Sequence, residues 1–412
     1  MLAQSPSAEA LRAPALWASL LEDAVSDRRR PRRIGAYRQL IASGVIEDMV
    51  AAYAAGRLVP SPPVRHHVNK HDGRQKVVFT FAPADELMFK AVNRVLQPLV
   101  EAALSRLCHS FRPGRGPRSA YGEIMRIPSV DRLASLHVDV RDYFNSIPVD
   151  QLLETLPEEL RGDHMLMRLL SEALHDRRVL VDGVLAEEPH KGVMAGTPLA
   201  PLLSDLYLRP LDRLFEDTRV PYVRYADDIL VLGEPAAIDR AREVIESKLA
   251  ALGLELNSRK TRSGAPGEPW EFLGFRFEAG VLDVAPRTAA KLRRRARRIA
   301  RRVAGRPQAA AYCVRRLNRR LYGVGGRRQD FSWAAWFFPL LGRTATLAQL
   351  DRVIQGHLRF AATGAHSRRN LGEVPYSVLL ASGYVPLVSA YHAFRTSPSA
   401  YRRLVDRRAG RC

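Results

Sequence analysis

A short apolar hairpin that carries two adjacent carboxylates constrains this chain more than any other feature. Residues 221–232 are Pro-Tyr-Val-Arg-Tyr-Ala-Asp-Asp-Ile-Leu-Val-Leu, so apolar and β-branched residues flank a polar tip. This pattern predicts two antiparallel strands joined by a tight turn. Asp227 and Asp228 would repel each other in such a turn, and a bound divalent cation would remove the repulsion. Asp-Asp turns also occur on ordinary surfaces, but the apolar flanks favour a metal site.

A third carboxylate, Asp139, stands near the end of the predicted strand Leu136–Val140. Two-metal chemistry needs ligands from a second strand, because two ions about 3.5–4 Å apart are bridged from both sides. We expect Asp142 to be a helix cap or a salt-bridge partner, because its Cβ vector does not converge with that of Asp139 in an extended chain. The sequence therefore predicts a site built from Asp139, Asp227 and Asp228.

The motifs around these carboxylates resemble those of reverse transcriptases, the RNA-directed DNA polymerases. The resemblance begins with Asp139-x-x-x-Tyr-Phe-x-x-Ile and Tyr225-Ala-Asp-Asp. Five further stretches stand in the family's order, at residues 70–76, 110–116, 191–207, 252–261 and 271–275. Together with a C-terminal block, Val374–Tyr391, they resemble group II intron-like and retron-like bacterial enzymes, above all the stand-alone ones associated with antiphage defence.

The resemblance implies an α+β fold shaped like a right hand. The expected parts are an N-terminal helical extension (1–60), fingers (61–130), a palm (131–284) with a fingers-derived insert around 160–195, and a basic α-helical thumb with a C-terminal extension (285–412). Periodic apolar residues predict one helix from Tyr37 to Tyr53 and another from Asp85 to Leu104. Asp72-Gly73 predicts the turn of a hairpin before the strand Val77–Phe81.

The resemblance also implies a cofactor, two Mg²⁺ ions or possible Mn²⁺ substitutes. Asp139 and Asp227 are the expected ligands, Asp228 a weaker one, and the backbone of Val140 a further one. One ion would lower the pKa of the primer 3′-hydroxyl, and the other would hold the triphosphate of the nucleotide.

Nucleotide contacts are expected from Lys70, Arg74, Lys76, Phe144, Ala195, Gly196 and Lys260. Phe144 occupies the place of a ring beneath the sugar that excludes a 2′-hydroxyl, although Phe is also an ordinary core residue. Lys260 is either a general acid for pyrophosphate or a phosphate contact. For the basic residues of the fingers, the alternative is an edge strand that avoids aggregation through its charge.

One loop departs from the family's pattern. Met194-Ala195-Gly196 stands where group II-like enzymes have Pro-Gln-Gly, and Ala200-Pro201 stands where they have Ser-Pro. Ala195 lacks the polar group of Gln, so we expect altered nucleotide affinity or fidelity, or a specialised template. Loss of activity is the alternative, against which the three carboxylates weigh.

Positive charge is concentrated in the last third of the chain. Residues 285–412 hold 27 Lys and Arg against 4 Asp and Glu, whereas residues 1–284 hold 37 against 39. A surface with so much like charge repels itself unless a polyanion covers it, and nucleic acid is the usual one. A membrane-surface helix would need large apolar anchors, which the Arg-rich stretch Ala289–Ala304 lacks. The expected nucleic-acid contacts are Arg112, Arg115, Gly274, Arg294, Arg298 and Arg301, with a structural turn as the alternative for Arg115.

The expected partners are an RNA template, in particular a structured non-coding RNA, together with dNTPs and a DNA product, and no membrane. No apolar run reaches transmembrane length and the start of the chain lacks a basic signal-peptide region, which predicts a cytoplasmic protein. Three unevenly spaced cysteines predict neither a disulfide framework nor a zinc site. A group II intron maturase and a non-catalytic RNA-binding protein on a polymerase scaffold are the alternatives.

Overall fold

The structure is a computed structural model that describes residues 5–26, 31–69, 75–323 and 332–409. The chain divides into two compact units. The first unit comprises residues 1–128 and 133–266, and the second comprises residues 129–132 and 267–412. The division at 266 falls inside the segment predicted as the palm. Both units mix helices with short strands, which confirms the predicted mixed α and β class.

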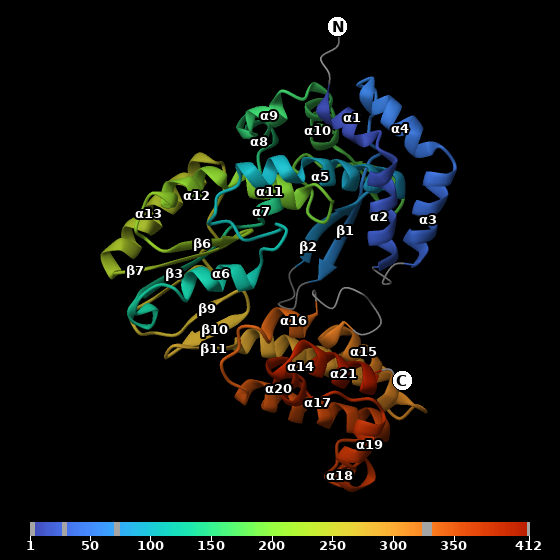
Figure 1. Cartoon of the computed structure of the whole chain (residues 1–412), viewed down its shortest axis with the longest axis vertical. Helices are drawn as coiled ribbons and strands as arrows, with labels where there is room; N and C mark the ends of the chain where they lie inside the picture. Colours follow the sequence, from blue (N-terminus) through green and yellow to red (C-terminus); the bar gives the residue numbers. More distant parts are fainter. Residues whose placement is uncertain (1–4, 27–30, 70–74, 324–331, 410–412) are drawn as a thin grey trace. The chain divides into compact units, whose positions relative to one another are not determined.

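Four N-terminal helices pack on one long helix of the first unit (Figure 1). They are α1 (Pro6–Leu11), α2 (Pro14–Ser26), α3 (Pro31–Ala42) and α4 (Val45–Ala54), and the long helix is α5 (Pro83–Ala103). The prediction of α5 is confirmed, but the prediction of one helix from Tyr37 to Tyr53 is wrong. Gly44 has a φ of +78° between α3 and α4, and this left-handed conformation interrupts the helix.

A four-stranded sheet of the first unit joins segments that are far apart in the sequence. Its order is β2-β1-β4-β5, formed by β1 (Val64–Asn69), β2 (Gln75–Thr80), β4 (Arg178–Val181) and β5 (Val184–Glu187). The antiparallel pairing of β1 with β2 confirms the predicted hairpin, while its turn at Asp72-Gly73 lies outside the described residues. β4 pairs in parallel with β1, so the insert expected around 160–195 completes this sheet.

A second four-stranded sheet, of order β6-β7-β3-β8, carries the predicted carboxylates. It consists of β3 (Ala134–Asp139), β6 (Tyr222–Tyr225), β7 (Asp228–Gly233) and β8 (Arg262–Gly264), all antiparallel to their neighbours. The long helix α13 (Pro235–Ala251) packs on β3 and β7, and α6 (Pro117–Ile124) contacts β6 (Figure 1). The hairpin predicted at residues 221–232 is confirmed.

Short helices connect these sheets. They are α7 (Tyr143–Ser146), α8 (Val149–Thr155), α9 (Glu158–Arg161), α10 (His164–His175), α11 (Ala200–Tyr207) and α12 (Arg209–Glu216). One apolar core runs from the N-terminal helices through α5 and α11 to α13.

The second unit combines a small sheet with a group of helices. The sheet has the order β11-β10-β9, from β9 (Trp270–Phe272), β10 (Phe275–Glu278) and β11 (Val281–Val284). The helices are α14 (Pro286–Arg301), α15 (Ala309–Tyr322), α16 (Trp333–Phe337), α17 (Ala345–Thr363), α18 (Asn370–Glu373), α19 (Tyr376–Ala381), α20 (Leu387–Thr396) and α21 (Pro398–Ala409). The arginine-rich helix α14 packs on α15 and α17. Within the described residues, no helix is long and apolar enough to cross a membrane.

The loop between β5 and α11 is fastened to two neighbouring segments. The amide of Val193 donates to the carbonyl of Phe144 at 2.8 Å, and the amide of Phe79 donates to the carbonyl of Ala195 at 2.8 Å. Gly192 has a φ of +52°, and a Cβ on it would lie 2.3 Å from the Phe144 carbonyl oxygen. Only glycine permits this close approach.

The variant Gly192→Ala should therefore be much less stable than its matched control, Gly183→Ala. Gly183 also has a positive φ, +84°, but a Cβ there would have no heavy atom within 4 Å among the described residues. We expect about 1 kcal/mol of destabilisation for Gly183→Ala, from the backbone conformation alone, and about 3 kcal/mol or more for Gly192→Ala, because the loop must also move. Urea unfolding measures both, and equal losses would contradict the close approach.

Candidate active site

The turn between β6 and β7 presents two carboxylates beside the end of β3. Ala226 adopts a φ of +55°, Asp227 follows it, and Asp228 begins β7. In the strand register Asp228 pairs with Tyr225 on one side and with Asp139 on the other. The structure thus brings together the three carboxylates predicted from the sequence.

The carboxylates influence one another electrostatically. The pKa of Asp227 is raised to about 6, mainly by burial and in addition by the negative charges of Asp228 and Asp139. This is the like-charge repulsion expected from adjacent acidic residues. A bound cation would relieve it, because positive charge favours the ionised form of all three groups.

Asp139 already has a cationic neighbour. Its side chain is almost fully buried, and the ammonium group of Lys260 donates to Oδ1 while Asn257 Nδ2 donates to Oδ2 at 2.8 Å. At the neighbouring carboxylate, His137 Nε2 lies 3.3 Å from Asp228 Oδ1. Positive charge is therefore favoured at this end of the sheet.

Carboxylate oxygens are the ligands that Mg²⁺ prefers, so the residue types fit a divalent ion. In the described part of the chain, however, no three His, Cys, Asp or Glu side chains are grouped as a metal site. The Lys260 ammonium occupies one oxygen of Asp139, so metal binding there requires the Lys260 side chain, which is one-third exposed, to turn away.

Val140, whose backbone was expected to be a further metal ligand, directly follows β3. It is buried and pairs with Leu256 through an isolated bridge.

Two of the expected nucleotide contacts lie next to each other. Lys76, in β2, places its Nζ atom 5.5 Å from the ring centroid of Phe144, in α7, over the face of the ring. Lys70 and Arg74 lie outside the described residues. Lys76 and Phe144 therefore bring β2 into contact with α7, the helix that follows Asp139.

Ala195 and Gly196, which were also expected to contact the nucleotide, pack within the protein in the loop between β5 and α11. Ala195 is 2% exposed, and its amide donates to Asn145 Oδ1 at 3.1 Å. A Cβ on Gly196 would lie 3.0 Å from the carbonyl oxygen of Phe79. Because the Ala195 side chain is buried, it does not support the predicted contact with a nucleotide.

Asp142 stands at the N-cap position of α7 with a φ of +40°, but its side chain makes no capping hydrogen bond. Its carbonyl accepts from the amides of Asn145 at 3.0 Å and Ser146 at 3.1 Å, which are the first hydrogen bonds of the helix itself. The predicted capping role of the Asp142 side chain is therefore not confirmed.

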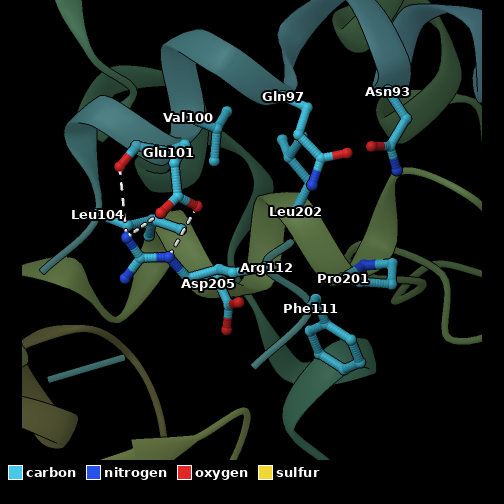
Figure 2. A pocket seen from close by; sticks show the side chains of 10 residues that line it. All are labelled: Asn93, Gln97, Val100, Glu101, Leu104, Phe111, Arg112, Pro201, Leu202 and Asp205. Carbon is cyan, nitrogen blue, oxygen red and sulfur yellow. Dashed lines mark hydrogen bonds and ion pairs between the residues drawn. The ribbon is translucent and has the colours of Figure 1, made fainter. Parts of the chain in front are cut away.

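Arg112 requires a correction. Its side chain is buried and donates to the carboxylate of Glu101 (Figure 2). It also donates to the carbonyls of Ser105 at 2.6 Å and Cys108 at 2.9 Å. Since its donors are used inside the protein, the structure does not support the predicted contact with a template phosphate. The nearby Arg115 is partly exposed, and its Nη1 atom donates to the Arg106 carbonyl at 2.8 Å.

The second unit holds the remaining predicted nucleic-acid contacts. Gly274 lies between β9 and β10 with a φ of +86°, where a Cβ would approach Thr288 Oγ1 to 3.0 Å. Arg294, Arg298 and Arg301 are exposed on α14, on the side away from the buried residues of the helix. Burial lowers the pKa of Arg295, and the positive charges of Arg320, Arg298 and Arg316 lower it further. This clustering of guanidinium groups favours an anion.

Sequence reasoning missed a fully buried charged residue of the first unit, Arg224 in β6. Its guanidinium is fully buried and donates to Asp212 at 2.6 and 2.7 Å and to Asp205 Oδ1 at 3.1 Å. Burial alone would lower the pKa of Arg224, but Asp212 and then Asp205 outweigh it and raise the pKa. The signal in the sequence was an arginine inside an apolar strand.

Arg224 also touches the turn that carries the carboxylates. Its Nη1 atom donates to the carbonyl of Ala226 at 3.2 Å, and Ala226 is the residue with the left-handed backbone. An L-residue other than glycine seldom adopts this conformation without support. The buried guanidinium therefore acts as a positioning group for the turn.

Comparisons with known proteins agree with this geometry. Residues 75–277 match the family described as "Reverse transcriptase (RNA-dependent DNA polymerase)". The "Uncharacterized 91 kDa protein in cob intron" of Schizosaccharomyces pombe is 26% identical over 179 residues, 42% of this chain and 21% of that protein. "Protein YkfC" of Escherichia coli is 23% identical over 263 residues, 54% of this chain and 68% of that protein.

A solved structure shares the fold. The apo telomerase from Candida tropicalis superposes with a TM-score of 0.50 at 12% identity, over 82% of this chain and 63% of that one. This chain spans about a fifth of the first relative and less than two thirds of the telomerase chain. The matched domain is that of RNA-directed DNA polymerases, which are nucleotidyltransferases.

The variant Arg224→Ala should be destabilised by about 3–5 kcal/mol, because it leaves two carboxylates buried without their partner. The matched control is Arg242→Ala, whose guanidinium pairs with Glu246 at 2.9 Å on the surface. We expect the control to lose less than about 1 kcal/mol, because solvent screens an exposed pair. Urea unfolding of both variants is the measurement, and a similar loss in both would contradict the role of the buried charge.

Proposed function

We propose that this chain, which carries a reverse transcriptase domain over residues 75–277, is an RNA-directed DNA polymerase. The observation that carries the proposal is the convergence of Asp139, Asp227 and Asp228 at one end of an antiparallel sheet. They fall in the matched region, in the motifs that resemble the catalytic motifs of the family. The reaction is template-directed formation of a phosphodiester bond.

Asp139 and Asp227 would hold the divalent ions, with Asp228 as a weaker ligand and the Val140 backbone as a further one. Bound Mg²⁺ or Mn²⁺ would supply charge stabilisation for the attacking and leaving oxygens. Asp139 keeps its orientation through the hydrogen bond from Asn257 at 2.8 Å. Lys260 neutralises the same carboxylate before a metal binds, and its released ammonium group could then bind a phosphate or act as a general acid.

Lys76 and Phe144 would contact the incoming nucleotide. The Lys76 ammonium lies over the Phe144 ring, so a triphosphate at Lys76 brings the sugar close to that ring. A bulky ring beneath the sugar excludes a 2′-hydroxyl and selects deoxynucleotides. Lys70 and Arg74 belong to the same proposed phosphate-binding segment, and Gly196 to the loop that borders it.

The second unit would bind nucleic acid through its basic helices. Arg294, Arg298 and Arg301 on α14 are exposed. Residues 285–412 hold 27 basic and only 4 acidic residues, which gives this segment a large positive charge. Phosphates neutralise such a surface and release counterions. Arg115 and the Gly274 turn are further proposed contacts, whereas Arg112 supports its loop through the pair with Glu101.

The template is proposed to be a dedicated non-coding RNA copied in antiphage defence. The support is the resemblance of the Val374–Tyr391 block to stand-alone bacterial enzymes and the altered loop at Met194-Ala195-Gly196. A second candidate, an intron-type reverse transcriptase and maturase, is favoured by the printed name of the fission yeast relative, which places that protein in an intron. Sequencing the RNA that co-purifies from native cells separates the two, since one gives a non-coding RNA and the other intron RNA.

A non-catalytic RNA-binding protein on a polymerase scaffold is the remaining alternative. The three carboxylates weigh against it, because burying Asp227 beside the charges of Asp228 and Asp139 costs stability unless a cation binds. Pure RNA binding needs no such group. Catalysis therefore accounts for a feature that binding alone leaves unexplained.

The variant Asp227→Asn should abolish DNA synthesis and leave RNA binding largely intact, because it removes a metal ligand and no basic residue. Primer extension on an RNA template in Mg²⁺ or Mn²⁺ measures the first property, and a filter-binding assay measures the second. We expect at least about a thousandfold loss of extension, the size of effect that essential catalytic groups have.

The matched control for this experiment is Asp142→Asn. Asp142 lies in the chain between β3 and α7, and its side chain makes no capping hydrogen bond that the change could remove. The control should therefore extend primers at close to the wild-type rate. Undiminished extension by Asp227→Asn would contradict the proposed function.

A further inference from the structure

One exposed aromatic residue beside the carboxylates has an unfavourable backbone conformation. Phe111 lies in the loop between α5 and α6, is 45% exposed, and has a φ of +50°. A bulky residue rarely adopts a left-handed conformation, and the conformation costs of order 1–3 kcal/mol. It persists only where the surrounding structure imposes it, so the neighbours of Phe111 are informative.

Both neighbours of Phe111 are anchored in the interior. Ser110 is fully buried, and its hydroxyl donates to Asp205 Oδ1 at 2.6 Å. Arg112 is held by Glu101, with its Nε atom 2.8 Å from Oε2. Phe111 lines the same small pocket as Arg112 and Asp205, and Figure 2 shows its ring pointing away from the α5 side chains Asn93 and Gln97. The anchors thus fix an exposed ring in one direction.

The ring of Phe111 is directed at two aromatic residues of the candidate active site. Its centroid lies 6.4 Å from that of Phe144, at an interplanar angle of 72°, and 6.1 Å from that of Tyr225. Tyr225 pairs with Asp228 in the strand register. Phe144 also has Lys76 over its face. The Phe111 ring is therefore in T-shaped contact with the Phe144 ring.

We propose that Phe111 is a specificity-determining residue that holds the Phe144 ring in place against the sugar of the incoming nucleotide. The inference rests on the proposed function. A ring that excludes a 2′-hydroxyl must keep its position to within a fraction of an ångström, because a small tilt makes room for one oxygen atom. Edge-to-face contact with a second, fixed ring restrains such a tilt. This restraint explains why a strained and exposed phenylalanine occupies position 111.

The variant Phe111→Gly tests the inference, because glycine accepts the left-handed backbone and removes only the ring. We expect its thermal unfolding midpoint to stay close to the wild-type value. The selectivity for dNTP over rNTP, measured as the ratio of the two kcat/KM values, should fall by about fivefold, the size of effect expected from losing one or two aromatic contacts. Phe111→Tyr keeps the ring and should keep the ratio.

Two controls separate a role through Phe144 from a general structural role. Leu214→Ala removes an apolar side chain that is 46% exposed on α12, and it should leave the ratio unchanged. In a Phe144→Ala background, where the excluding ring is already absent, Phe111→Gly should cause no further loss of selectivity.

Three results would overturn the inference. An unchanged dNTP/rNTP ratio in Phe111→Gly would show that the ring does not act on sugar selection, and an additional loss in the Phe144→Ala background would show that it does not act through Phe144. Unfolding of Phe111→Gly would contradict the argument from backbone strain. If the wild-type protein incorporates neither nucleotide, the proposed polymerase function fails, and this inference fails with it.

Discussion

The buried guanidinium of Arg224 is the interaction on which the candidate active site depends. It joins Asp205 of α11 and Asp212 of α12 to strand β6, and it donates to the Ala226 carbonyl in the turn. Two carboxylates and one guanidinium are stable in the core only together, because each is costly to bury alone. Asp205 also accepts from Ser110. One charge cluster therefore positions both the carboxylate turn and the segment that presents Phe111.

The carboxylates themselves are arranged at a cost to stability that a cation removes. Burial and mutual repulsion raise the pKa of Asp227 to about 6, and the Lys260 ammonium lies against Asp139. Such crowding favours positive charge at this end of the sheet, because a nearby cation stabilises the ionised form of a carboxylate. In the second unit the arrangement is reversed, since guanidinium groups gather on α14 and α15 and favour anions. The two units thus gather opposite charges, carboxylates at the end of a sheet in the first and guanidinium groups on α14 and α15 in the second.

Local patterns predicted much of the fold and of the site. The hairpin at 221–232, the hairpin of β1 and β2 and the long helix α5 follow from alternation, turn residues and helical spacing. The parallel pairing of β1 with β4 and the pairs of Arg112 with Glu101 and Arg224 with Asp212 were not predictable in this way. They join segments through tertiary packing, and an arginine looks the same in a sequence whether it meets a phosphate or a buried carboxylate. Ala195 was assigned to the nucleotide because its loop resembles that of the family, and its burial follows from packing that the sequence does not show.

The most direct test of the account is addition of a single nucleotide to a primer annealed to RNA. Four templates that differ only in the first unpaired base are each offered the four dNTPs separately, with Mg²⁺ or Mn²⁺. We predict that the wild-type protein adds mainly the complementary deoxynucleotide on each template. Absence of addition under all these conditions, or addition that ignores the template base, would contradict an RNA-directed DNA polymerase centred on Asp139, Asp227 and Asp228.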